Sequence, residues 1–258
     1  PHRYRNSDKP SFKKILKLVI IIAALIFLII LALLIFEYSL DQYNKEDIPQ
    51  TTNNSTYIEP VAQDISSFDF GSYNLACDWR LVVVNKYNEI PDNYNPNLCE
   101  FYDKTIDSRI KNDLEALISD AKKDNIDIWI SSGYRSFDEQ TSLFDAEVLS
   151  NITSGYDNVQ ALSLAERLVA RPRKSEHHTG LAIDINGVQD SFKDTDAFKW
   201  MCSHCYDYGF ILRYPEEKSN ITGINFEPWH FRYVGVYHAK AIKNLDMCLE
   251  EYVYSLIK

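Results

Sequence analysis

Ser175-Glu-His-His-Thr-Gly-Leu-Ala-Ile-Asp184 is the stretch that decides the fold, because it joins a histidine-containing loop to a short alternating segment. From residue 181 to 185 the side chains alternate as in a strand, with the large aliphatic residues toward a core and Asp184 on the opposite face. Gly180 precedes this strand, and a residue without a Cβ can form the turn that brings His177 back to the carboxylate. The stretch therefore predicts an imidazole and a carboxylate close together.

A second segment, Glu227-Pro-Trp-His230, precedes another alternating run at residues 231–236. A helix is not expected here, because the proline disfavours the helical conformation at Glu227. In a regular strand, Glu227 and His230 would face opposite sides. Both side chains can reach one site only if the proline and tryptophan between them form a bulge or bend, and we predict that bend.

Together the two segments supply two imidazoles and two carboxylates. A catalytic zinc ion needs three protein ligands and an open position for water. His177, Asp184 and His230 could provide the three ligands, which leaves Glu227 for proton transfer. We expect His178 to be a loop residue, because a fourth protein ligand would close the site to water.

These segments, with Ser132-Gly-Tyr-Arg-Ser136 and Gln140, resemble the VanY-like D-alanyl-D-alanine carboxypeptidases of the zinc-dependent D,D-peptidase family. The likeness runs from about residue 78 to 235. One departure lies at Pro172-Arg-Lys174, where relatives often carry Pro-Gly. The resemblance implies a zinc D,D-peptidase/Hedgehog-like fold and a Zn²⁺ cofactor in the site.

The resemblance also implies a role for each site residue. The metal ligands would be His177, Asp184 and His230, the base would be Glu227, and Arg135 would stabilise the substrate or the developing oxyanion. Further positions would line the substrate cleft: Ser175 and Gln140, with Tyr134 and Trp229 as additional candidates for which core packing is the alternative.

The activity implied by the resemblance is removal of the terminal D-alanine from peptidoglycan stem peptides, without a covalent acyl-enzyme. An L,D-carboxypeptidase acting on tetrapeptide stems is an alternative, but residues 132–140 and 209–215 look most like the VanY-type enzymes. A non-catalytic cell-wall-binding module is a second alternative, and such a module would have no use for Glu227. A serine peptidase is disfavoured, because Ser11-x-x-Lys14 lies on the expected cytoplasmic side and Ser108-x-x-Lys111 has no later S-x-N triplet.

Residues 18–36 form a run of 19 residues without a charge, long enough as a helix to nearly span a membrane. Six Lys and Arg residues precede this run and acidic residues follow it, so residues 1–17 are expected to be a cytoplasmic tail. A cleaved signal peptide is the alternative, but the stretch is too long and no small-residue cleavage site follows it. We therefore expect an uncleaved single-pass anchor in the cell membrane and an extracytoplasmic remainder.

Residues 37–67 are rich in Asn, Thr, Gln and Ser, which predicts a flexible linker, and residues 68–258 are long enough for one domain. After the first 17 residues, the chain carries 21 basic and 36 acidic residues. This negative charge argues against nucleic acid as a partner. The expected partners are a peptidoglycan stem peptide or its precursor and, through residues 18–36, the membrane.

Alternating periodicities predict an α+β domain with a small, mostly antiparallel sheet and helices on one side. Helices are expected after Thr105, over 137–149 and 158–170, from 195 to a stop at Gly209, and from 237 to the C-terminus. Strands are expected near 80–85, 126–130, 181–186, 210–213 and 230–235.

Five cysteines lie outside the predicted membrane segment: Cys77, Cys99, Cys202, Cys205 and Cys248. The C-x-x-C spacing of Cys202 and Cys205 is typical of redox or zinc sites, but both fall in an expected helix beside apolar residues. A buried structural pair is therefore favoured, and no second C-x-x-C exists to complete a zinc site. Cys77 and Cys99 could be joined, but the connectivity does not follow from the sequence.

Overall fold

The computed structural model describes residues 65, 67–74 and 78–258, which belong to a compact unit from Glu59 to Lys258. The predicted tail, membrane helix and nearly all of the predicted linker lie outside the described residues, as does Cys77. Ile65, at the end of the predicted linker, packs into a small cluster with Ile221 and Cys248. Within the described part, every helix is too short or too polar to cross a membrane.

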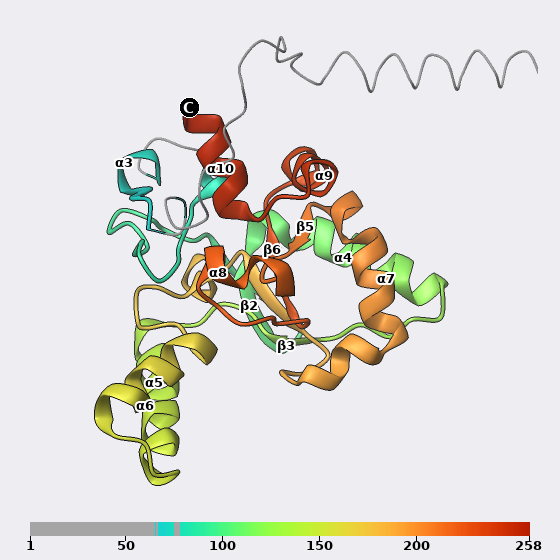
Figure 1. Cartoon of the computed structure of the whole chain (residues 1–258). Helices are drawn as coiled ribbons and strands as arrows, with labels where there is room; N and C mark the ends of the chain where they lie inside the picture. Colours follow the sequence, from blue (N-terminus) through green and yellow to red (C-terminus); the bar gives the residue numbers. More distant parts are fainter. Residues whose placement is uncertain (1–64, 66, 75–77) are drawn as a thin grey trace, which may run out of the picture. The chain divides into compact units, whose positions relative to one another are not determined.

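The centre of this unit is a four-stranded antiparallel sheet (Figure 1). Its strands follow the spatial order β3 (Ile130–Ser132), β4 (Ala182–Ile185), β6 (His230–Tyr233) and β5 (Phe210–Leu212). The register pairs Ser132 with Asp184 and Asp184 with His230 across the three neighbouring strands. Three polar positions are thereby aligned on one line across the sheet.

A separate antiparallel hairpin, β1 (Leu98–Phe101) and β2 (Lys104–Asp107), precedes the sheet in the chain. The longer helices are α4 (Lys111–Lys123), α5 (Phe137–Thr153), α6 (Asn158–Leu168), α7 (Asp196–His204), α9 (Val236–Leu245) and α10 (Leu249–Ile257). The one-turn helices are α3 (Gly71–Asn74) and α8 (Ser219–Thr222). Helices α5 and α6 lie side by side and extend away from the sheet (Figure 1).

The main core lies on the face of the sheet that α4 and α7 cover. Leu117 of α4 and Met201 of α7 pack in one cluster with Ile183 of β4 and Phe231 of β6. On β5, the neighbouring Ile211 belongs instead to a second cluster, with residues of α9 and α10. Helices therefore meet the sheet on both faces, and the prediction that they lie on one side is wrong.

Several predicted elements differ from the structure. The strand expected near 80–85 is wrong: Trp79–Leu81 form the 3₁₀ helix η1, and an extended segment without a strand partner follows. The helix expected after Thr105 begins later, at Lys111, because the preceding residues form β2 and the 3₁₀ helix η2 (Ser108–Ile110). The C-terminal helix is two helices, which separate at Asp246, whose backbone is left-handed with φ 52°.

Candidate metal centre

His177, Asp184 and His230 meet at one point, although they come from three different elements. His177 lies in the 3₁₀ helix η3 (Glu176–Thr179), Asp184 lies in β4, and His230 is the first residue of β6. One ligand atom from each lies within 4.8 Å of the others. His177 Nε2 is 3.4 Å from Asp184 Oδ2, and His230 Nδ1 is 3.2 Å from Asp184 Oδ1.

The turn before β4 forms as the sequence predicts. Gly180 ends η3 in the left-handed conformation, with φ 69°, and a Cβ there would lie 2.9 Å from the backbone nitrogen of Asp107. The Ser175 hydroxyl accepts a hydrogen bond from the His177 amide and caps the start of η3. These contacts hold the His177 side chain beside Asp184.

The predicted bend before β6 is also present. The His230 amide donates to the Glu227 carbonyl at 3.2 Å, which closes a turn over Pro228 and Trp229. The Ile185 amide donates to the Trp229 carbonyl, so the end of the turn is attached to β4. The bend allows Glu227 and His230 to face the same site.

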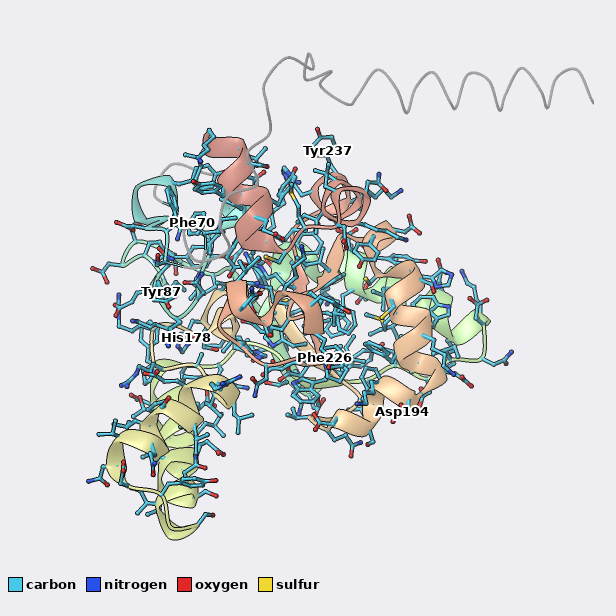
Figure 2. All side chains as sticks on the ribbon, viewed as in Figure 1. Phe70, Tyr87, His178, Asp194, Phe226 and Tyr237 are labelled. Carbon is cyan, nitrogen blue, oxygen red and sulfur yellow. The ribbon has the colours of Figure 1, made fainter. Side chains whose placement is uncertain are left out.

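Hydrogen bonds distinguish the two neighbouring histidines of η3. His177 Nδ1 lies 2.7 Å from the Gly133 carbonyl oxygen, so its Nε2 remains for a metal. His178 uses both ring nitrogens elsewhere, because Nδ1 contacts the Arg135 carbonyl and Nε2 accepts from the Arg173 amide. His178, which is labelled in Figure 2, also packs against Phe137 at the start of α5 and is not one of the three clustered residues.

The three residues fit a bound cation. Asp184 Oδ1 is buried without a hydrogen-bond partner among the described residues, although His230 Nδ1 lies 3.2 Å from it. Burial alone would raise the pKa of Asp184, but the two neighbouring histidines outweigh burial and lower it. An anionic oxygen and two imidazole nitrogens, with no fourth protein ligand, are the donor set of a catalytic zinc site.

Glu227 lies beside the proposed ligands without being one of the three. Its Oε2 is 3.5 Å from His230 Nδ1, and its side chain is 13% exposed at the edge of a cavity. Burial raises the pKa of Glu227 to about 8, although the neighbouring His230 partly opposes this shift. A carboxylate with a raised pKa is suited to accept and return a proton.

Arg135 is held in place by its neighbours rather than projecting into solvent. Its guanidinium donates to Gln140 Oε1 at 2.7 Å and to Ser132 Oγ at 3.2 Å, and it lies 3.9 Å from Asp184 Oδ2. Gln140 is buried, and its amide nitrogen donates to the Ala170 carbonyl. Gln140 therefore fixes the position of Arg135 in addition to lining the cavity.

A cavity of about 300 Å³ adjoins the cluster. Its polar lining includes Ser175, Gln140 and Arg135, as the resemblance implied, and Trp229 also contacts it. The cavity also has an apolar wall that no sequence pattern predicted, which consists of Leu143, Leu168, Val169, Ala170, Val188 and Ile224. Tyr134, which was also a candidate, is not among the described residues that line this cavity.

Two further site residues, beyond the apolar wall, were not recognised from the sequence. Tyr214 lines the cavity, and its ring centroid lies 4.8 Å from that of His230. Glu176, between Ser175 and His177, is fully buried behind His230. Both belong to segments that the resemblance covers, but no residue pattern pointed to their side chains.

The cysteines do not form a second metal or redox centre within the described residues. The thiols of Cys202 and Cys205 are not joined in a disulfide, and Cys205 is buried in the main core. Burial raises the pKa of Cys202 to about 11 and that of Cys205 well above its ordinary value. Neither thiol is therefore suited to ionise for redox or zinc chemistry.

An α+β unit with two histidines, an aspartate, and a glutamate beside them is typical of metal-dependent hydrolases. The family model for D-alanyl-D-alanine carboxypeptidase, VanY, matches residues 103–236, and the chain belongs to this family. A D-alanyl-D-alanine carboxypeptidase of Enterococcus faecalis is 39% identical over 177 residues. This match covers 68% of the present chain and 66% of the relative, so the chain spans slightly less than two thirds of that relative.

Solved structures show the same fold. The vancomycin-resistance D,D-pentapeptidase VanY, in a mutant form in complex with Zn(II), is 40% identical with a TM-score of 0.64. That likeness covers 68% of this chain and 99% of the other. The L,D-carboxypeptidase LdcB is 36% identical with a TM-score of 0.60, over 68% of this chain and 86% of the other.

Proposed function

We propose that this protein is a zinc D,D-carboxypeptidase that hydrolyses the terminal D-alanine from peptidoglycan stem peptides. The observation that carries the proposal is the cluster of His177, Asp184 and His230, with Glu227 and Arg135 on the same cavity. Zn(II) in a VanY structure at 40% identity supports the choice of metal.

Different residues of the chain would bind the metal, transfer the proton and stabilise the developing negative charge. His177, Asp184 and His230 would hold zinc, which when bound supplies a Lewis acid that polarises a carbonyl and lowers the pKa of water. Glu227 would take a proton from the attacking water at its carboxylate and return it to the leaving amine. Arg135, oriented by Gln140, would donate hydrogen bonds to the oxygen that gains negative charge.

The substrate is proposed to be a pentapeptide stem ending in D-Ala-D-Ala. The D,D-pentapeptidase VanY is 40% identical to this chain and the L,D-carboxypeptidase LdcB 36%, so identity favours D,D cleavage by a small margin. A pocket feature that discriminates one methylene contributes only ~1–3 kcal/mol, so the test must compare both substrates directly. L,D cleavage of a tetrapeptide stem is the second candidate, because the LdcB fold is also matched.

The test gives the zinc-loaded full chain matched pentapeptide and tetrapeptide stems and identifies the products by mass. Loss of one alanine from the pentapeptide alone is the expected result. Trimming of the tetrapeptide alone would make the protein an L,D-carboxypeptidase. Binding of both peptides without cleavage would favour the non-catalytic cell-wall-binding module instead. A sample treated with a chelator is the control for metal dependence.

We further propose that residues 18–36 anchor the protein in the cell membrane with residues 1–17 in the cytoplasm. The support is the uncharged run and the excess of Lys and Arg before it. A protease added to intact cells should cut within residues 37–67 and release an active fragment. Protection of this segment from the protease would reverse the orientation.

A further inference from the structure

Glu176 occupies a position that metal binding and proton transfer leave unexplained. Its side chain is completely buried, and its Oε2 lies 3.6 Å from His230 Nε2. Neither atom has a hydrogen-bond partner within the described part of the chain. Two unsatisfied buried polar atoms that face each other indicate a functional contact, because each would otherwise cost stability.

The His230 ring lies between Glu176 and the other residues of the metal site. On one side, Nδ1 faces Asp184 Oδ1 at 3.2 Å and Glu227 Oε2 at 3.5 Å. Nε2, on the opposite side, faces Glu176. An imidazole can bind a metal through Nδ1 only if that nitrogen carries no proton, so a neutral ring must then carry its proton on Nε2.

Two arginines fix the direction in which Glu176 points. Its Oε1 accepts from Arg213 Nε and from Arg232 Nη1, each at 2.7 Å. Arg213 in turn donates to both carboxylate oxygens of Glu250 in α10, at 2.8 and 2.6 Å. Because both arginines use Oε1, the other oxygen remains directed at His230.

Charge balance alone is the competing explanation for Glu176. The network contains two carboxylates and two guanidinium groups, all with side chains that are fully buried or nearly so. Charge balance explains why Glu176 is paired with Arg213 and Arg232. It does not explain why Oε2 lacks an arginine partner and faces an imidazole nitrogen that also lacks one.

We propose that Glu176 is a positioning residue that accepts a hydrogen bond from the Nε2–H of His230 and thereby presents Nδ1 of His230 to the metal. Arg213 and Arg232 hold Glu176 in this orientation, and Glu250 balances the charge of Arg213. This inference rests on the proposed zinc site. Carboxylate partners of this kind orient metal-binding histidines and raise their basicity, typically changing affinity by ~10–100-fold.

The first test uses the wild-type protein and does not depend on a variant that folds. Nitrogen-15 NMR of the zinc-loaded full chain identifies which ring nitrogen of each histidine binds the metal. We expect His230 to bind through Nδ1 with a proton on Nε2, and His177 to bind through Nε2. Zinc on Nε2 of His230 would overturn the proposal, because that nitrogen could not donate to Glu176.

The second test compares zinc affinity in Glu176→Gln and Glu250→Gln by competition with a chromophoric chelator. Both variants remove one negative charge from the same buried network, but only Glu176 faces His230. We expect Glu176→Gln to bind zinc ~10–100-fold more weakly and Glu250→Gln to stay within about threefold of wild type. The absorption bands of the Co²⁺-substituted protein should change only in Glu176→Gln.

The outcomes separate this inference from the proposed function. Equal loss of zinc affinity in both variants, or none in Glu176→Gln, would reduce Glu176 to a charge-balancing role while leaving the zinc site intact. A wild-type protein that binds no zinc would instead contradict the proposed function itself. Chemical unfolding of each metal-free variant measures the stability cost separately, so lost folding is not mistaken for lost positioning.

Discussion

Asp184 shows how one position in a strand determines the chemistry of the site. It lies in the central strand β4, paired with Ser132 on one side and His230 on the other. The second imidazole therefore reaches Asp184 through strand pairing, whereas His177 reaches it through the turn at Gly180. A register shift of one residue would turn Asp184 into the core and remove the cluster.

Replacing Glu227 by glutamine separates metal binding from proton transfer. Glu227 is not one of the three clustered ligands, so Glu227→Gln should retain zinc. The amide cannot accept the proton of water, so turnover should fall by ~10²–10⁴. Release of D-alanine and the zinc content of the purified protein are the measurements. His230→Ala is the control and should lose zinc, whereas unchanged turnover in Glu227→Gln would remove Glu227 from the mechanism.

The sequence predicted the groups at this site better than their contacts. Two imidazoles and two carboxylates in short segments identify a metal site, because few other arrangements need those residue types together. The partners of Glu176 could not be predicted in the same way. They are Arg213, which directly follows β5, and Arg232, which lies in β6, and only the pairing of β5 with β6 brings them together.

At the level of elements, the loop before η3 contains a strained residue. Arg173 has φ 71°, a left-handed conformation that favours glycine. Its side chain pairs with Glu89 and Asp92 at the surface, and its amide donates to His178. Exposed ion pairs of this kind contribute little to stability, typically ~0–1 kcal/mol.

Two substitutions at Arg173 isolate the backbone strain. Arg173→Ala and Arg173→Gly both remove the ion pairs, but only glycine relieves the left-handed backbone, which costs other residues ~1–2 kcal/mol. Glycine loses ~0.5–1 kcal/mol more chain entropy on folding, so the glycine variant should be more stable by about 1 kcal/mol. Urea unfolding measures the difference, and equal stabilities would show that the loop carries no such strain.

Asp107, at the end of β2, should make the stability of the folded unit depend on pH in the acid range. Its buried carboxylate accepts hydrogen bonds from the Asn97 amide and from the amide and guanidinium of Arg109. Burial opposes ionisation, but these hydrogen bonds hold the pKa of Asp107 below its ordinary value. Since the folded pKa is depressed, this stabilisation is present above the unfolded pKa, ~3.9, and is lost as pH falls through the folded pKa.

Asp107→Asn should therefore lower stability by ~1–3 kcal/mol at pH 7, and the difference from wild type should shrink below about pH 4. Urea unfolding at pH 7 and pH 3 measures both values. Asp145→Asn, which removes an exposed carboxylate from α5, is the matched control and should change stability little. A difference that stays constant with pH would mean that the charge of Asp107 does not matter.

The sequence predicted those elements whose side-chain periodicity reflects their burial, as with α4, in which Leu114, Leu117 and Ala121 are buried. It failed at residues 81–84, an apolar run that reads as a strand. Asn74 makes both backbone hydrogen bonds of Val83, and Arg232 donates to the carbonyls of Arg80 and Val82. Side chains from distant segments replace the neighbouring strand there, and local periodicity contains no information about such partners.

At the scale of the whole unit, the metal site depends on elements from much of its length. Its residues come from the loop after β3, from η3, β4 and β6, and the network behind them reaches Glu250 in α10. The complete ligand set therefore exists only when the sheet is assembled. Because the unfolded chain lacks this arrangement, zinc should bind the folded unit preferentially and stabilise it.

Removal of zinc should accordingly lower the unfolding temperature of the whole unit. A ligand present at 1,000 times its Kd stabilises the state it binds by ~4 kcal/mol, and each kcal/mol shifts the midpoint of a domain of this size by ~2–4 °C. The zinc-loaded protein should therefore unfold roughly 8–16 °C above the chelated protein. Calorimetry with zinc and with chelator measures the shift, and His230→Ala should show almost none. A wild-type protein whose midpoint does not change on chelation would show that zinc binding and folding of this unit are not coupled.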